Sequence, residues 1–420
     1  MKKLLKASSI YVFSTILVSI IPFLLIPVMT RYLTKEEYGQ VAMFQILVSA
    51  MSAIVGFSVY GAANRKYFDQ DVSQQTLQKF NGACFHILLT STFVFLIILI
   101  FIKEWIAKHF DIPPSWILVA LVVSFTSFVV QIRLGQWQIR EKAKLFGIFQ
   151  IIQSLLNAIL SIVFVVVLLK GAQGRIDAQM FVMLLFTLIS VYLLYRDKLV
   201  VLFQWNPILI REALSFGIPL VPHVVGGFLL LSVDRIVINE KLGLAEVGIY
   251  MLAVQLSSVL KIIFHSINKA YSPWLFGELK TNNEKTKIQI VKLTYLYFLC
   301  LLFISGLIFL FGPFFVVLIA GSDYQNAGPI IGYLCLGNIF NGMYLMVANY
   351  IFYSKKTFRL SLVTVSSGVI NIILLFLLIE PYGLVGAGIA FAVSNFVMFL
   401  LAWITSSKSH NMPWFSALLK

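Results

Sequence analysis

The sequence predicts an all-α integral membrane protein with twelve transmembrane helices, and three observations lead to this fold class. Hydrophobic residues make up 60% of the 420-residue chain and charged residues only 12%, whereas a soluble domain is about 25% charged. Apolar runs of about 20 residues, enough to cross a bilayer as a helix, recur from one end to the other. The basic residues between these runs gather on one side of the predicted membrane.

Each predicted span is an apolar run bounded by polar or charged residues, and the connections between runs are short. The longest polar gap, residues 269–290, is too short for a soluble domain. Any binding or chemistry is therefore expected inside the helix bundle or at its ends. The predicted spans are residues 8–30, 38–61, 80–102, 115–133, 146–169, 178–196, 213–233, 248–268, 291–318, 327–352, 360–379 and 384–405.

The distribution of Lys and Arg orients these helices. Far more of the 32 basic residues lie at the two chain ends and in the even-numbered connections than in the odd-numbered ones. Basic segments mark the cytoplasmic ends of spans, so we expect both termini in the cytoplasm and an even number of spans. The net charge of +15 then reflects basic loops against an anionic leaflet, and no nucleic acid is expected as a partner.

The chain is predicted to contain two copies of a six-helix unit. Residues 140–150 and 354–364 align without gaps, each segment joins two spans, and each leads to an asparagine and another aliphatic run. Paired prolines, followed by an Arg, a Gly and a Gln, recur in the same order near the start of both halves. We therefore expect an N-terminal lobe at 1–205 and a C-terminal lobe at 206–420. Transporters built from such parallel repeats bind substrate between the halves.

Lys261 is the strongest single signal for function, because it lies near the middle of the predicted span 248–268. A lysine at the centre of a membrane helix costs about 2.5–3.5 kcal/mol on insertion scales. Ser257, His265 and Lys269 follow at helical spacing and form one polar stripe with it. We expect the stripe to face a wet cavity. The alternative is a Lys261 that snorkels to the cytoplasmic side or bonds a carbonyl.

Basic residues at the ends of spans add to this charge, and they are Arg31, Arg65, Arg133 and Arg235. Each one alone is typical of an interfacial anchor. Together with Lys261 they predict a cationic cavity, since none of the 17 Asp and Glu residues falls deep in a predicted span. Such a cavity attracts an anion such as a phosphate or diphosphate. The candidate substrate-binding residues are Lys261, His265, Lys269, Arg31, Arg65 and Arg235.

Three histidines and one acid are candidates for ion coupling. His86, His223 and His265 lie within predicted spans, and imidazole titrates near neutral pH, so each could couple transport to protons. A hydrogen-bonded core imidazole is the alternative for each of them. Asp234 is the acid nearest the membrane, and it is either a coupling site or one half of an ion pair with Arg235.

Several classes of site have no counterpart in the sequence. No P-loop pattern occurs, so we expect no ATP hydrolysis of that kind. No spacing of Cys and His predicts a metal site. The segment Asp69-Gln70-Asp71 resembles the Asp-x-Asp of metal-dependent glycosyltransferases, but no domain is there to hold a nucleotide sugar, so we interpret it as coincidence. We expect a transporter without metal or cofactor, not an enzyme.

Five segments resemble those of the Wzx-type O-antigen and polysaccharide flippases, in the multidrug/oligosaccharidyl-lipid/polysaccharide exporter superfamily. They follow the family's order along the chain and lie at residues 21–39, 215–223 with 232–236, 247–250, 270–276 and 383–388. The resemblance implies two six-helix lobes around a V-shaped central cavity. It also implies translocation of an undecaprenyl-diphosphate-linked glycan repeat unit from the inner to the outer leaflet of the bacterial cytoplasmic membrane by alternating access.

The partners that the resemblance implies are the lipid-linked glycan, membrane lipid and, as candidates, a polysaccharide polymerase and a chain-length regulator of O-antigen or capsular polysaccharide synthesis. Lipid II flippases of the same superfamily have two further spans, which argues against a peptidoglycan precursor as substrate. Two alternatives stay open. A cation-coupled multidrug antiporter would need buried acids, and a membrane-embedded glycosyltransferase or polymerase would need a catalytic acid or a large outer loop.

Overall fold

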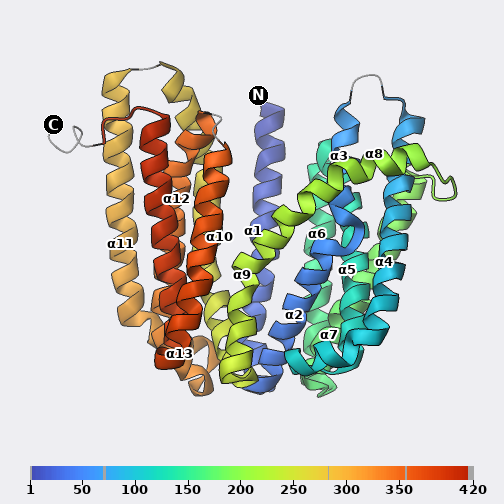
Figure 1. Ribbon diagram of the computed structural model, residues 1–420, viewed down its shortest axis with the longest axis horizontal. Coiled ribbons are helices and arrows are strands. Elements are labelled where there is room, and N and C mark those ends of the chain that lie inside the picture. Colours follow the sequence, from blue (N-terminus) through green and yellow to red (C-terminus); the bar gives the residue numbers. More distant parts are fainter. Residues whose placement is uncertain (1, 70–71, 282, 355–356, 415–420) are drawn as a thin grey trace. The chain divides into compact units, whose positions relative to one another are not determined.

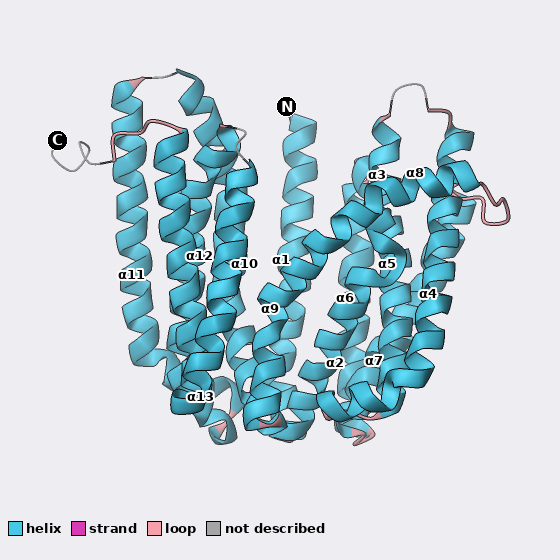
Figure 2. Ribbon diagram, viewed as in Figure 1, coloured by secondary structure: helices cyan, strands magenta, loops and turns pink. Residues whose placement is uncertain are grey.

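A computed structural model describes residues 2–69, 72–281, 283–354 and 357–414 of the chain. Within these residues every regular element is a helix (Figure 2), which confirms the all-α prediction. The helices are α1 (Lys2–Tyr32), α2 (Lys35–Ile54), α3 (Val59–Arg65), α4 (Gln74–Phe110), α5 (Pro114–Ile139), α6 (Ala143–Ile162), α7 (Gly171–Arg196), α8 (Pro207–Gly217), α9 (Val221–Leu242), α10 (Leu244–Thr281), α11 (Glu284–Ala320), α12 (Gly328–Tyr353) and α13 (Thr357–Ser409).

Ten helical segments of the described chain are long and apolar enough to cross a bilayer, which confirms a multi-pass membrane protein. Two helices separate this number from the predicted twelve. α9, which overlaps the predicted span 213–233, is not among the ten. α13 is a single element of 53 residues, and it overlaps both of the predicted spans 360–379 and 384–405.

The backbone of α13 is not helical at Gly383, where φ is 55° and ψ is −136°. Glycine adopts a positive φ at little cost, so this residue lets the chain turn back on itself. The ribbon of α13 runs to one end of its bundle and returns (Figure 1). An unbroken helix of that length would be more than twice the roughly 30 Å of a hydrocarbon core. The twelve-helix count stays a prediction that depends on this turn and on α9.

The chain forms two compact units, Met1–Ile236 (unit 1) and Val237–Lys420 (unit 2). Figure 1 shows the course of the helices in each of them. Each unit has its own packed interior, so each is described by itself. The predicted boundary of a duplicated lobe after residue 205 is a statement about ancestry, which compactness does not test, and it stays a prediction.

In unit 1 the connections predicted to be cytoplasmic meet at one end. Asn81 near the start of α4 donates to the carbonyl of Leu199 at 2.7 Å, so the segment after α7 is held against α4. At the other end, the Glu37 carboxylate at the start of α2 accepts a hydrogen bond from Ala172 N in the first turn of α7 at 3.3 Å. The alternation of connections along the chain therefore agrees with the predicted one in this unit.

The second predicted span is interrupted, which the sequence pattern did not predict. Between α2 and α3, Gly56, Phe57 and Ser58 all have positive φ, a conformation that costs energy for a residue other than glycine. A Cβ on Gly56 would overlap the Phe128 ring. The Gly56 N–H donates to Ser91 Oγ at 3.0 Å. The break is thus held by glycine in a confined space and by a side chain that replaces a lost helical bond.

The seventh predicted span, 213–233, begins in one helix and continues in another. α8 and α9 are joined by a short 3₁₀ segment at Ile218–Leu220, which contains Pro219. Proline has no N–H for the helical ladder and its ring crowds the preceding turn, so regular α-helix is interrupted there. The interruption falls at the first of the paired prolines in this half of the sequence.

Arg133 and Asp197 form a buried ion pair in unit 1. The Arg133 side chain is 1% exposed, its Nη2 lies 2.5 Å from Asp197 Oδ2, and its guanidinium lies 4.0 Å over the Trp137 ring. Burial alone would raise the pKa of Asp197, but the hydrogen bond and charge of Arg133 lower it from its ordinary value. The pair therefore connects the end of α7 to the interior of the unit.

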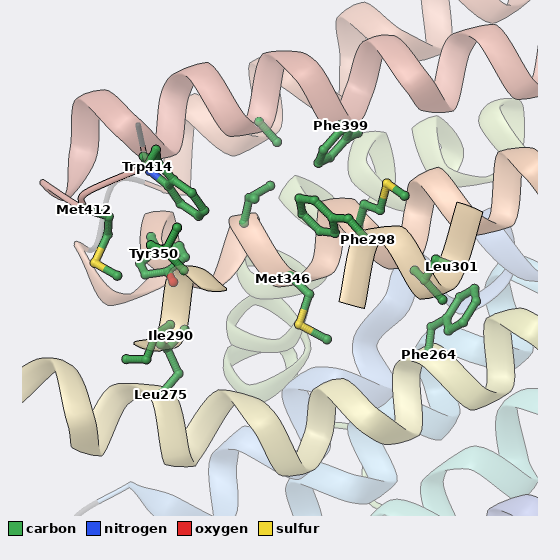
Figure 3. Close-up of a cluster of buried hydrophobic side chains, with 14 of the residues drawn as sticks. Phe264, Leu275, Ile290, Phe298, Leu301, Met346, Tyr350, Phe399, Met412 and Trp414 are labelled. Atoms are coloured by element: carbon green, nitrogen blue, oxygen red, sulfur yellow. The ribbon is translucent and has the colours of Figure 1, made fainter. Parts of the chain in front are cut away.

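Unit 2 has an aromatic core at the end where its helices α12 and α13 finish. Figure 3 shows Phe298 of α11 with Phe399 of α13, and their ring centroids lie 5.3 Å apart. Trp414, beyond the end of α13, is 5% exposed, and its carbonyl accepts a hydrogen bond from Tyr295 at 2.8 Å. The segment after α13 is thereby packed into the unit. Burial of such aromatic side chains is a large part of bundle stability.

The ends of the helices of unit 2 also alternate as predicted. Ser354, after α12, donates to the carbonyl of Ser409 at 3.1 Å, so both predicted cytoplasmic ends lie together. Near the opposite end of the same helices, Lys241 of α9 and Glu380 of α13 form an ion pair at 2.8 Å. The turn at Gly383 is therefore at the end that the charge distribution assigns to the outside.

Cysteine labelling in whole cells checks the orientation and the turn at Gly383. With an impermeant maleimide, Asn326→Cys and Tyr382→Cys should react in intact cells, because both residues are exposed and predicted to be outside. Lys285→Cys and Ser407→Cys, which are exposed at the predicted cytoplasmic end, should react only after the membrane is permeabilised.

The native thiols Cys84, Cys300 and Cys335 are first replaced by serine or alanine. A reversed labelling pattern at all four positions would contradict the orientation. Protection of Tyr382→Cys, with Asn326→Cys still labelled, would show that α13 does not turn outside and would remove the twelfth span.

The buried pair of unit 1 predicts a large effect on stability. Asp197→Ala leaves Arg133 buried without its counter-charge and should cost about 3–5 kcal/mol, whereas Arg133→Met with Asp197→Ala should restore part of that loss. The measurement is thermal unfolding of purified protein in detergent. Because the folded-state pKa of Asp197 is lowered, the contribution should be complete above about pH 4 and decline as the pH falls further.

Glu380→Ala removes one partner of the exposed pair with Lys241 and is the matched control, with no more than a small shift expected. If Asp197→Ala were as mild as this control, the prediction that the buried pair contributes strongly to stability would be wrong.

Candidate functional site

The described structure brings Lys261, His265 and Lys269 together along one edge of α10. Lys261 is half-buried, and His265 and Lys269 are exposed. Both lysines are close enough to His265 to act on it electrostatically. Three of the six candidate substrate-binding residues therefore share one surface of unit 2, which we call the cationic edge of α10.

The packing of α12 against α10 determines where this edge begins. Phe264 is 3% exposed, and a Cβ on Gly342 of α12 would lie 2.7 Å from its ring. Asn338 of α12 donates to the carbonyl of Ser257 at 3.3 Å, and Ser257 itself is buried. Residues four apart drift by about 40° around a helix. The predicted stripe thus starts in the packed face at Ser257 and leaves it by Lys269.

α10 has a second exposed surface, and its chemistry is different. Ile263 and Ile267 are 45% and 41% exposed, and they lie away from the cationic edge around the helix. Large apolar side chains are the ordinary lipid-facing residues of a membrane helix. The two surfaces have opposite preferences for solvent, so we expect lipid on the isoleucine side and water on the lysine side.

The charge of the edge comes from the sequence of α10 itself. Between Glu246 and Glu278 the helix contains no Asp or Glu. A polar contact beside the edge is neutral, because Asn349 of α12 donates to Asn268 at 2.8 Å. A half-buried ammonium in low dielectric attracts anions more strongly than one in water. The edge is therefore suited to an anionic group with several acceptor oxygens.

Asp234 and Arg235 lie side by side in α9. Their side chains are 13% and 12% exposed, and Asp234 Oδ1 lies 3.5 Å from Arg235 Nη1. The same carboxylate accepts a hydrogen bond from the Arg235 backbone N–H at 2.9 Å. This geometry corresponds to the ion-pair alternative of the sequence interpretation. A coupling role for Asp234, and substrate binding by Arg235, stay predictions.

Arg31 and Arg65 belong to unit 1, and both are exposed. Arg31 lies in the last turn of α1, where a cation complements the helix dipole. Arg65 lies 5.3 Å over the Phe216 ring of α8 and lines a cavity of about 160 Å³ with Lys66 and Glu212. Lys66 and Glu212 are ion-paired at 2.6 Å, so this cavity has acids as well as bases.

His86 has a structural environment in unit 1. Its Nε2 lies 2.6 Å from the carbonyl oxygen of Leu202, and because a carbonyl only accepts, this nitrogen carries the proton. Its ring centroid lies 5.2 Å from that of Trp205. These contacts fit the alternative of a hydrogen-bonded core imidazole, and a coupling role stays a prediction. The side chain of His223 lies outside the described residues.

A polar cluster within unit 1 was missed by the sequence interpretation. Arg175, counted there among the loop charges, lies inside α7 and donates to Asn157 of α6 at 3.0 Å. One turn further along α7, Gln179 accepts a hydrogen bond from Gln45 of α2. An arginine within a membrane helix is a functional candidate by default. The one available signal was Asn157, a polar residue in an aliphatic run.

Two solved structures show which known fold this chain shares. An inward-facing multidrug resistance MATE family transporter of the MOP superfamily matches with a TM-score of 0.72 at 15% identity, over 93% of this chain and 94% of that one. The lipid II flippase MurJ, in an inward closed conformation, matches with a TM-score of 0.73 at 15% identity, over 96% and 87%. This chain therefore has the fold of these two membrane proteins.

The sequence comparison identifies the family. Residues 4–277 match the polysaccharide biosynthesis protein family, and the chain belongs to that family. Protein 1 of the Lsg locus of Haemophilus influenzae is 27% identical over 378 residues, which is 88% of this chain and 90% of that protein. The succinoglycan biosynthesis transport protein ExoT of Rhizobium meliloti is 23% identical over 322 residues, which is 75% and 62%. The predicted resemblance is confirmed.

The two surfaces of α10 predict different access to water. In membranes, a charged, water-soluble methanethiosulfonate should modify single cysteines at Lys261, His265 and Lys269, because the reagent requires a hydrated thiolate. Cysteines at Ile263 and Ile267 should react at least about tenfold more slowly, since lipid excludes both water and thiolate.

Equal modification at the lysine and isoleucine positions would contradict the separation into wet and lipid-facing surfaces. Modification at Lys269 and His265 but not at Lys261 would favour the alternative in which Lys261 snorkels to the cytoplasmic side.

Proposed function

We propose that this protein is a flippase that translocates undecaprenyl-diphosphate-linked oligosaccharide repeat units from the inner to the outer leaflet of the bacterial cytoplasmic membrane. The observation that carries the proposal is the cationic edge of α10, with Lys261 half-buried at mid-span on a helix that has no acid between Glu246 and Glu278. A diphosphate offers this edge two linked anionic groups. The product would serve O-antigen, capsular or exopolysaccharide synthesis.

Membership of the polysaccharide biosynthesis protein family supports a glycan as cargo. The name of the Rhizobium meliloti relative, a succinoglycan biosynthesis transport protein, supports transport of a polysaccharide precursor. The fold of a lipid II flippase supports a cargo on a lipid carrier. These three arguments carry over to this chain what is known of other proteins. The charge of α10 is the argument that comes from this chain itself.

The proposed mechanism assigns a different task to each position of the edge. Lys269 is exposed toward the cytoplasmic end of α10 and would attract the diphosphate by charge, and the exposed His265 would donate a hydrogen bond to it. Lys261, half-buried and closer to mid-span, would hold it where water competes less. Alternating access then exposes the bound group to the outer leaflet. A polymerase and a chain-length regulator are proposed as partners that use the product.

The competing function is a cation-coupled multidrug antiporter, which the MATE fold also serves. A cationic drug and a coupling cation require buried carboxylates. Between Glu246 and Glu278, α10 has no carboxylate. The carboxylate of Asp234 in α9 is paired with Arg235. The edge repels a cationic drug. We therefore prefer the anionic lipid-linked cargo.

Variants of Lys261 in a deletion strain test the proposed function. Deletion should abolish surface polysaccharide while lipid-linked repeat units persist in the inner leaflet. Lys261→Ala should restore at least about tenfold less surface polysaccharide than the wild type, since a charge-assisted hydrogen bond contributes about 1.5–3 kcal/mol. Lys261→Arg should restore part, because it keeps the charge but changes the geometry. The measurement is surface polysaccharide relative to membrane protein level.

Lys280→Ala is the matched control, because it removes an exposed cation from the last turn of the same helix. Normal output from Lys261→Ala at normal abundance would contradict the proposed binding role. Loss of the lipid-linked units themselves in the deletion strain, without toxicity of trapped carrier, would contradict translocation as the function.

A further inference from the structure

A groove lies between the two halves of α13 at the predicted cytoplasmic end of unit 2. It has a volume of about 320 Å³ and includes Arg359 near the start of α13 and Lys408 near its end. Between them it is lined by Leu362, Leu401 and Ile404. It is separate from the cationic edge of α10, and none of the candidate site residues lines it.

The charged end of the groove is basic on both sides. Arg359 and Lys408 are both exposed, and no acid is among the residues that line the groove. Glu284, a described acid from the same end of the unit, is paired with Lys287 of its own helix at 2.7 Å. Two cations that share one groove repel each other, and an anion between them would relieve that repulsion.

The position of Arg359 gives a second, independent reason to expect an anion. Lys408 lies in the last turn of α13, where a cation complements the helix dipole. Arg359 lies in the first turn, two residues after Thr357, where the dipole disfavours a cation and favours an anion. The dipole accounts for Lys408 but not for Arg359. A bound anion would neutralise both basic residues and would also interact favourably with the N-terminus of α13.

The walls of the groove are apolar and face outward from unit 2. Leu362 and Ile404 are each 54% exposed, and Val363 and Leu401 continue the apolar surface. Thr405 adds a hydroxyl close to the basic end, although it already donates to the carbonyl of Leu401 at 2.7 Å. The groove therefore has basic residues at one end and apolar residues toward mid-membrane. This arrangement suits an amphiphile with an anionic head group and an apolar tail.

We infer that this groove binds an anionic phospholipid of the cytoplasmic leaflet, with its phosphate between Arg359 and Lys408 and an acyl chain along Leu362 and Ile404. Ser354, which follows α12, donates to the carbonyl of Ser409 at 3.1 Å, so the end of α12 lies against the end of α13 beside the groove. The lipid would thus hold together the start and the end of α13. The site is one of lipid recognition and is independent of the cargo of the protein.

Native mass spectrometry of the full-length protein in a neutral detergent tests the site. Dioleoyl phosphatidylglycerol should bind more tightly than dioleoyl phosphatidylcholine, which has the same chains and no net charge. Arg359→Gln with Lys408→Gln should weaken phosphatidylglycerol binding about 25-fold, since each basic residue near an anionic lipid contributes roughly fivefold. Ser366→Phe, which fills the apolar part of the groove, should weaken the binding of both lipids.

The matched control is Lys285→Gln with Lys292→Gln, which removes two exposed cations of α11 from the same unit and should leave phosphatidylglycerol binding unchanged. Equal loss in the two double variants would overturn the site, because the effect would then be one of net charge. Undecaprenyl phosphate is the third probe. If it displaces phosphatidylglycerol from the groove at equal concentration, the groove belongs to the lipid carrier, and the assignment to a phospholipid is wrong.

Discussion

In the core of a bilayer no water is present to bond an exposed backbone N–H or C=O, and every other feature of this structure depends on that constraint. It makes helices the only described elements, and it limits where they can be interrupted. At the break after α2, the Gly56 N–H finds Ser91 Oγ at 3.0 Å. At Gly383 the chain turns at the end of its bundle. At these two breaks a side chain or the membrane interface can replace the lost bonds.

The same absence of water sorts the charged residues into two kinds. Arg133 is 1% exposed, and it is neutralised by Asp197 and stacked on Trp137. Lys66 is likewise paired with Glu212 of α8. These cations hold segments of unit 1 together, and a ligand is not needed to explain them. The cationic edge of α10 differs in composition, because its basic residues lie on a helix that has no acid between Glu246 and Glu278.

The sequence predicted the membrane class and most helices because both follow from local hydrophobicity. It also placed Lys261, His265 and Lys269 on one surface, since their spacing needs only the geometry of a helix. It did not predict that Ser257 is covered by α12, which depends on how Asn338 approaches it. The partner of Arg133 was equally hidden, because Asp197 is distant in sequence. Charge reveals that a residue needs a partner, and only packing reveals which one.

Graded burial along α10 gives the proposed mechanism its direction. Charge at an exposed site is weakened by water and salt, so Lys269 would attract a diphosphate from a distance but bind it weakly. At Lys261 the same interaction is stronger because less water competes, and the helix drift brings this residue next to the packed face. A diphosphate that moves inward along the edge therefore gains attraction as its own hydration decreases. A polar stripe straight along the helix would lack this gradient, so the drift of four-residue spacing is itself part of how the edge would work.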